Sequence, residues 1–219
     1  VKRLKAAYDI CCGSEKLDQD ERDHVHFYLA IRSILHKLTK GDAPDAAQMA
    51  HGGETHADVA FAYARIGKVY DSEADYEKAL VQYRRALDIQ IRVFGQERLE
   101  VADLYNNIGE VYRRQGKVQE ALEQLNRAFE IRIRELGKDH PDVANTGESI
   151  AIIYQEQGKF EEALEIYELA LATRIRVCGQ DHPNVAASYR NIGIVYQHQG
   201  NMSAATEMYT KAYHTYLQV

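Results

Sequence analysis

The stretch Asn106–Leu122 reads NNIGEVYRRQGKVQEAL and holds two apolar patterns separated by Gly116. On either side of this glycine, apolar residues recur three and four positions apart, which is the spacing of one face of an α-helix. Glycine adopts a left-handed backbone without strain and commonly follows the last turn of a helix. The stretch therefore predicts two helices that fold back on each other as a hairpin.

The pattern of this hairpin recurs along the chain with a period of 42 residues. Several aligned positions keep their residue type in all four copies, which excludes a chance match. The clearest columns are Val59, Val101, Val143 and Val185; Tyr70, Tyr112, Tyr154 and Tyr196; and Ala79, Ala121, Ala163 and Ala205. Small residues such as Gly109 and Ala121 are expected where two helices cross closely, with Leu125 filling the space between units.

Glycine and proline mark the ends of the predicted helices. Glycines at 116, 158 and 200 follow the first helix of a hairpin, and glycines at 95, 137 and 179 follow the second. Pro141 and Pro183 stand at the first position of the next helix, where a missing N–H costs nothing. His140 and His182 precede them as expected helix caps, which explains their recurrence without a metal.

These signals predict an all-α fold made of antiparallel helix pairs that stack into a solenoid. We divide the chain into four repeats at 56–97, 98–139, 140–181 and 182–219. Residues 1–55 are predicted to form a degenerate helical segment that contains the end of an earlier repeat, one helix at Asp20–Lys40 and a loop at Gly41–Glu54. Because the chain starts without methionine and stops inside a helix, we expect it to be part of a longer protein.

Composition narrows the function classes. The formal net charge of −6 argues against a surface built for nucleic acid, and no apolar run is long enough to insert into a membrane. The three cysteines have neither a disulfide-framework nor a zinc-site spacing, so a cytoplasmic protein with reduced thiols is expected. No nucleophile with a base, metal-ligand set or phosphate loop is present, so the sequence predicts no enzyme, no cofactor and no metal.

The repeated residues resemble the tetratricopeptide repeat in its 42-residue kinesin light chain-like form. The motifs that carry the resemblance are NNIGEVY at 106–112, QGKVQEAL at 115–122, HPDVA at 140–144 and NIGIVY at 191–196. The resemblance covers residues 56–219 and implies a right-handed superhelical solenoid whose first helices line a concave groove. It does not imply attachment to a motor, because the coiled-coil heptads of such a chain are absent from these residues.

The resemblance also implies which side chains point into the groove. We expect a peptide-binding set of amides, cations and apolar anchors along the first helices. Its members are Arg65, Lys68, Asn106, Asn107, Arg113, Arg114, Ile152, Arg190, Asn191 and Ile194. Asn107 and Asn191 match the asparagine that holds the backbone of a bound peptide in this family, and a solvated polar residue is the competing interpretation. Arg113 and Arg114 could equally be ordinary surface charges.

The predicted function is a non-catalytic scaffold or adaptor that binds an acidic or amphipathic segment of a partner protein, in the manner of cargo recognition. The first alternative is a sensor or autoinhibitory repeat domain of a larger signalling protein or NTPase. The second is self-association through an uncapped C-terminal repeat, where Tyr209, Tyr213 and Leu217 form an apolar face. The arginines late in the second helices, as in IRIR at 131–134, are predicted to favour the negative helix end.

Overall fold

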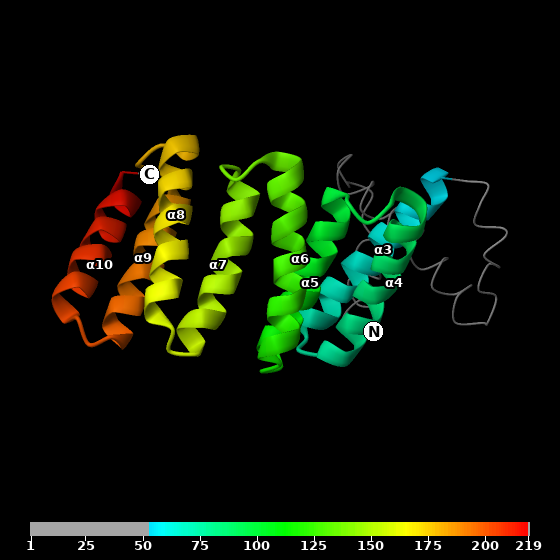
Figure 1. Cartoon of the computed structure of the whole chain (residues 1–219), viewed down its shortest axis with the longest axis horizontal. Helices are drawn as coiled ribbons and strands as arrows, with labels where there is room; N and C mark the ends of the chain where they lie inside the picture. Colours follow the sequence, from blue (N-terminus) through cyan, green and yellow to red (C-terminus); the bar gives the residue numbers. More distant parts are fainter. Residues whose placement is uncertain (1–52, 219) are drawn as a thin grey trace, which may run out of the picture. The chain divides into compact units, whose positions relative to one another are not determined.

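The computed structural model describes residues 53–218, and the predictions for residues 1–52 lie outside this range (Figure 1). The chain divides into two compact units, Val1–Ala62 and Tyr63–Val219, and the second unit holds the helices from residue 76 onward. The regular secondary structure of residues 53–218 is entirely helical, with no strand. The helices are α3 (Gly53–Ser72), α4 (Tyr76–Phe94), α5 (Leu99–Arg114), α6 (Val118–Leu136), α7 (Pro141–Glu156), α8 (Phe160–Cys178), α9 (Pro183–His198) and α10 (Met202–Leu217).

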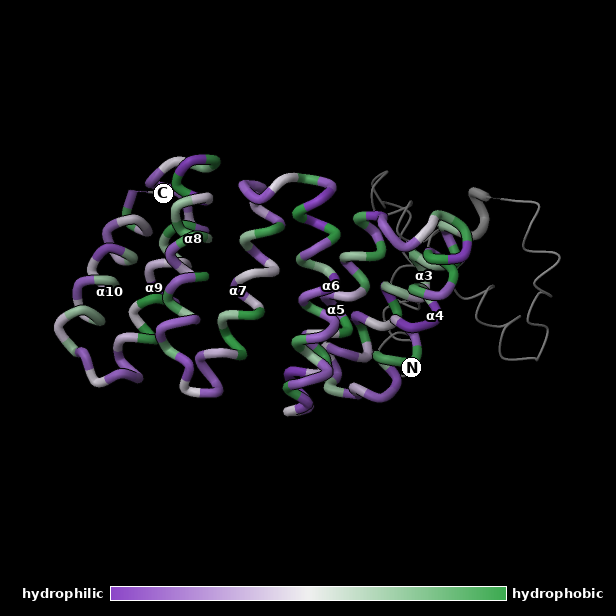
Figure 2. Tube along the Cα trace, viewed as in Figure 1, coloured by the Kyte–Doolittle hydropathy of each residue, from purple (hydrophilic) through white to green (hydrophobic). Residues whose placement is uncertain are grey.

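Consecutive helices pack against each other in chain order, from α4 against α5 to α9 against α10 (Figure 1). Helices α5 and α7, which are the first helices of neighbouring hairpins, also meet. This nearest-neighbour packing confirms the all-α solenoid predicted from the 42-residue period. Apolar and polar residues alternate along each helix in Figure 2, as expected when one side of a helix is buried and the other meets water.

The core follows the aligned columns of the sequence. Ala79, Ala121 and Ala163 are completely buried where the two helices of a hairpin cross, and Leu125 is buried beside them. Gly109 is required by the same crossing. A Cβ atom on it would lie 2.7 Å from Cγ of Leu125 and 3.2 Å from the backbone oxygen of Ala121, closer than ordinary contacts allow.

Helix ends are formed by the residues that the sequence indicated. Gly116 has a φ of +72°, and the N–H of the following Lys117 donates to the carbonyl of Tyr112, which closes α5. His182 caps α9, because its Nδ1 accepts a hydrogen bond from the N–H of Asn184 at 3.1 Å. Helix α3 begins at Gly53, inside the stretch 41–54 that the sequence predicts as a loop, so the helix starts earlier than expected.

Candidate functional site

Four polar side chains of the predicted set on α5 and α9 have no hydrogen-bond or ion-pair partner among the described residues. Asn106 and Asn107 on α5 and Asn191 on α9 are half-buried, and their amides make no hydrogen bond within residues 53–218. Each amide can therefore donate and accept at once. Arg190 is exposed and has no counter-ion among the described residues.

Two apolar anchors of the predicted set lie on α7 and α9. Ile152 on α7 is half-buried and packs against the core cluster that includes Ala163 and Tyr167. Ile194 is half-buried on α9. Lys68 and Arg65 on α3 are exposed. The predicted residues thus occupy four successive first helices, and their side chains are not all equally available.

Arg113 and Arg114 are bound to carboxylates, most of them on neighbouring repeats. Arg113 lies 3.1 Å from Glu110 on its own helix and 2.8 Å from Glu156 on α7. Arg114 lies 2.5 Å from Asp71 on α3. These contacts neutralise two cations that the sequence predicts as members of the peptide-binding set. Among the predicted arginines on α5 and α9, Arg190 is therefore the one without a counter-ion in the part of the chain that the structure describes.

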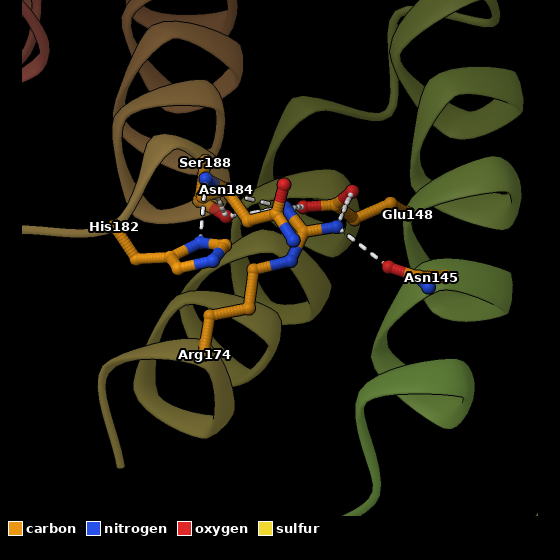
Figure 3. Close-up of polar contacts among 6 residues, drawn as sticks. All are labelled: Asn145, Glu148, Arg174, His182, Asn184 and Ser188. Carbon is orange, nitrogen blue, oxygen red and sulfur yellow. Dashed lines mark hydrogen bonds and ion pairs between the residues drawn. The ribbon is translucent and has the colours of Figure 1, made fainter. Parts of the chain in front are cut away.

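A second polar cluster lies between the repeats, and the sequence did not predict it. Arg174 on α8 reaches two first helices at once, as Figure 3 shows. Its guanidinium donates to both carboxylate oxygens of Glu148 at 2.6 Å and to Asn145 on α7 at 2.8 Å. On the other side it donates to the hydroxyl of Ser188 at 2.7 Å and to the carbonyl of Asn184 at 3.2 Å, both on α9. We call this arrangement the arginine clamp.

The clamp recurs one repeat earlier around Arg132. Its guanidinium donates to the Thr146 hydroxyl, to the carbonyl of Asp142 at 3.2 Å and to the carboxylate of Asp103. The expectation that the late arginines act through the helix dipole is incomplete for Arg132, because its side chain binds groups on α5 and α7. A sequence signal for the clamp was available. In two successive repeats, an arginine is followed 14 positions later by a residue with a hydroxyl group.

Burial governs the electrostatics of the clamp. The side chains of Arg174 and Glu148 are only 8% and 12% exposed. Desolvation raises the pKa of Glu148 above its usual range, although the charge and hydrogen bonds of Arg174 and the Ser188 hydroxyl act in the opposite direction. The clamp therefore holds a buried charge pair whose desolvation is offset by hydrogen bonds to groups on α7 and α9.

Residues 53–218 contain no group of three or more His, Cys, Asp or Glu side chains placed to hold a metal ion. No helix in this range is both long and apolar enough to cross a membrane.

Family models match most of the described residues. A tetratricopeptide repeat model matches residues 100–174 and 147–218, and a second tetratricopeptide repeat model matches residues 62–133. The chain belongs to the tetratricopeptide repeat family. Its 42-residue period and its structural neighbours make it a tetratricopeptide repeat protein of the kinesin light chain-like type, as the sequence predicted. Such repeats are in general non-catalytic, and the chain is a protein-interaction scaffold.

Solved structures share the fold at low sequence identity. The chain is similar to BtubC (BKLC) from P. vanneervenii, with a TM-score of 0.66 and 21% identity over 89% of this chain and 84% of that chain. It is also similar to a putative kinesin light chain from Podosopora anserina with nearly identical TPR-like repeats, with a TM-score of 0.63 and 19% identity over 97% and 94% of the two chains. For MamA the TM-score is 0.57 with 18% identity over 91% and 95%.

The N-terminal part has a different relative. Residues 1–62 match a model described as type I restriction enzyme HindI endonuclease subunit-like, C-terminal. No curated protein matches the chain significantly.

Proposed function

We propose that this scaffold binds an extended or amphipathic segment of a partner protein along the first helices α5, α7 and α9. The main observation in support is that Arg190 and Asn191 are adjacent on α9 and have no intramolecular partner among the described residues. Asn107 offers a second free amide on α5. Amides that donate and accept simultaneously suit the backbone of an extended peptide, which exposes both kinds of group.

The charge distribution supports a ligand with an acidic group beside α9. Since Arg113 and Arg114 are already paired, an incoming carboxylate at α5 or α9 gains most from Arg190. Half-buried Ile152 and Ile194 supply apolar contact on α7 and α9. We propose that the ligand is a segment of this composition in a cargo or adaptor protein of the cytoplasm. The kinesin light chain-like neighbours support this proposal by analogy.

The proposal predicts that loss of the free amides on α5 and α9, or reversal of the charge of Arg190, weakens binding without changing the fold. A pull-down with the wild-type chain, read by mass spectrometry, should lose the same partners in the Asn107→Ala/Asn191→Ala and Arg190→Glu variants. The dissociation constant for an acidic segment of such a partner should rise by about tenfold or more for Arg190→Glu.

Lys138→Glu is the matched control, because it makes the same charge change at an exposed turn residue that has no ion pair within the described range. Far-ultraviolet circular dichroism verifies that all variants stay helical. Equal partner lists and equal affinities for Arg190→Glu and Lys138→Glu would show that the first-helix face is not the binding site.

A second candidate function is a regulatory repeat domain of a larger enzyme. The match of residues 1–62 to the C-terminal region of a restriction endonuclease subunit favours it. Its test compares the ATPase and DNA-cleavage activities of the full-length protein with those of a version lacking residues 63–219. Basal activity that is identical in both would contradict a sensor or autoinhibitory role.

Self-association is the third candidate, and it is favoured by the outer face of α10. Tyr213, Tyr216 and Leu217 are 61%, 50% and 64% exposed. Tyr216 stands at the repeat position of Arg132 and Arg174, so α10 does not supply the arginine of a clamp. Light scattering across concentration tests it, with Tyr213→Ser/Leu217→Ser as the variant expected to stay monomeric. A wild-type chain that is monomeric at every concentration would exclude this candidate.

A further inference from the structure

One surface position is equivalent in the second helices of all four hairpins, and its residue differs in the third repeat. This position follows the buried alanine column by six residues and is exposed in α4, α6, α8 and α10. Three of the four repeats place a cation there, whereas the third repeat places a leucine. The four residues are Arg85, Arg127, Leu169 and Lys211.

The cation covers an aromatic ring of its own repeat. Arg85, Arg127 and Lys211 each lie over a tyrosine ring of the first helix, with distances to the ring centroids of 5.6, 5.6 and 5.9 Å. Those rings belong to Tyr63, Tyr105 and Tyr189.

In α6 and α10 the cation also pairs with a glutamate one turn earlier. Arg127 lies 2.9 Å from Glu123, and Lys211 lies 2.7 Å from Glu207. In both helices the cation therefore covers a ring and neutralises a carboxylate.

The third repeat lacks both the ring and the cation of this arrangement. Gly147 replaces the tyrosine, and a Cβ atom on it would lie 3.2 Å from Ile166 and 3.6 Å from the ring of Phe129. The space of the missing tyrosine is therefore already occupied from α6 and α8. Leu169 has no tyrosine of this column to cover, and it stays 61% exposed.

The glutamate of the arrangement is retained without its cation. Glu165 stands at the position of Glu123 and Glu207, and no ion pair reaches it within residues 53–218. Glu162 and Glu168 on the same helix are also exposed and unpaired in this range. Exposed Ala172 follows Leu169 by one turn. Together, Glu162, Glu165, Glu168, Leu169 and Ala172 form what we call the α8 stripe.

We propose that the α8 stripe is a second interaction surface that takes a basic amphipathic helix of a partner protein. An apolar side chain of that helix covers Leu169 and Ala172, and flanking lysines or arginines supply the cations that Glu162, Glu165 and Glu168 lack. The partner replaces in trans the charge that Arg127 and Lys211 provide in cis in the neighbouring repeats. This surface lies on a second helix, so the proposal stands independently of peptide binding by α5, α7 and α9.

The test restores the cation of the other repeats. The probe is a labelled synthetic amphipathic helix of about 18 residues, or about 27 Å, with one leucine stripe flanked by lysines. Binding is followed by fluorescence anisotropy at several salt concentrations. Leu169→Arg should weaken binding by about tenfold, because it removes the apolar anchor and gives Glu165 its own partner. Glu165→Gln/Glu168→Gln should weaken binding and flatten its salt dependence.

Val81→Arg is the matched control. Val81 is a 45% exposed aliphatic residue on α4, so the variant makes the same charge change on another second helix. Its affinity for the probe should equal that of the wild type. Hydrogen exchange with the probe bound should show protection on α8 and none on α9, and Asn191→Ala should leave the affinity unchanged.

Three outcomes would overturn the proposal. Equal losses in Leu169→Arg and Val81→Arg would mean that only the net charge of the protein attracts the probe. Protection on α9 would place the probe on the first-helix face. Concentration-dependent dimerisation that disappears in Leu169→Arg, seen by sedimentation without the probe, would assign the α8 stripe to a second copy of the chain.

Discussion

Replacing Arg174 by alanine should lower the stability of the C-terminal half of the solenoid by about 3–5 kcal/mol, because it leaves the buried Glu148 carboxylate without a cation. It also removes the donors to Ser188 and to the Asn184 carbonyl, so α8 and α9 lose this polar connection. Urea unfolding followed by circular dichroism measures the loss. Hydrogen exchange should show α9 and α10 opening before the rest, since each repeat depends on its neighbours.

Arg176→Ala is the control for this prediction. Arg176 lies on the same helix and pairs with Asp139 at 3.0 Å, but both side chains are more than half exposed. Exposed pairs contribute about 0–1 kcal/mol, so the unfolding midpoint should barely move. A shift for Arg174→Ala no larger than that for Arg176→Ala would show that the clamp does not stabilise the stack.

Glu148→Gln should cost less than Arg174→Ala. Burial raises the pKa of Glu148, so the folded state resists its ionisation. A folded-state pKa above the unfolded value means that the stabilising contribution of this group is present below the unfolded pKa and is lost as pH rises through the folded pKa. The advantage of wild type over Glu148→Gln should therefore shrink on going from acid to neutral pH in urea unfolding. An advantage that grows with pH would contradict the burial argument.

Replacing Ala121 by tryptophan should cost about 3 kcal/mol or more and open the second hairpin, because the crossing of α5 and α6 has no room for a ring. Ala121 is completely buried, and its backbone oxygen lies within 3.2 Å of the place where a Cβ on Gly109 would sit. The two helices can admit the ring only by moving apart, which would also disturb the stacking of α4 and α7. Thermal unfolding and hydrogen exchange of α5 and α6 measure the effect.

Glu120→Trp controls for the chemistry of the introduced residue. Glu120 precedes Ala121 and is exposed, so the same ring meets water there and stability should stay within about 0.5 kcal/mol of wild type. Similar losses for the two variants would mean that the destabilisation comes from helix propensity or aggregation and not from the close crossing of the helices.

The hairpins could be predicted from the sequence because their signals are local. Gly116 ends α5 because glycine adopts a positive φ without strain. Pro183 begins α9 because the first helical position does not need an N–H donor. The 42-residue period then fixes which residues are equivalent, and burial of Ala121 and Leu125 follows from that equivalence. These conclusions require only short stretches of chain and their repetition.

The availability of the predicted site residues could not be predicted in the same way. Asn107, Asn191 and Arg190 are identified by their repeat position, and the structure adds that they have no partner among the described residues. Arg113 and Arg114 occupy equally plausible positions, and carboxylates 43 residues away bind both. The sequence predicts that these side chains share one helix face, but it does not give the distances between them and their neighbours.

Helix periodicity and turn preferences act over a few residues, so the hairpins, their boundaries and the small residues at their crossings follow from the amino-acid sequence alone. Which charges are free depends on how the repeats stack. Arg174 meets Glu148 and Ser188 across sequence separations of 26 and 14 residues, and Leu169 stays exposed in the repeat where Phe129 fills the space beside Gly147. Long side chains find their partners only after stacking, because stacking sets the distance and burial on which each ion pair depends.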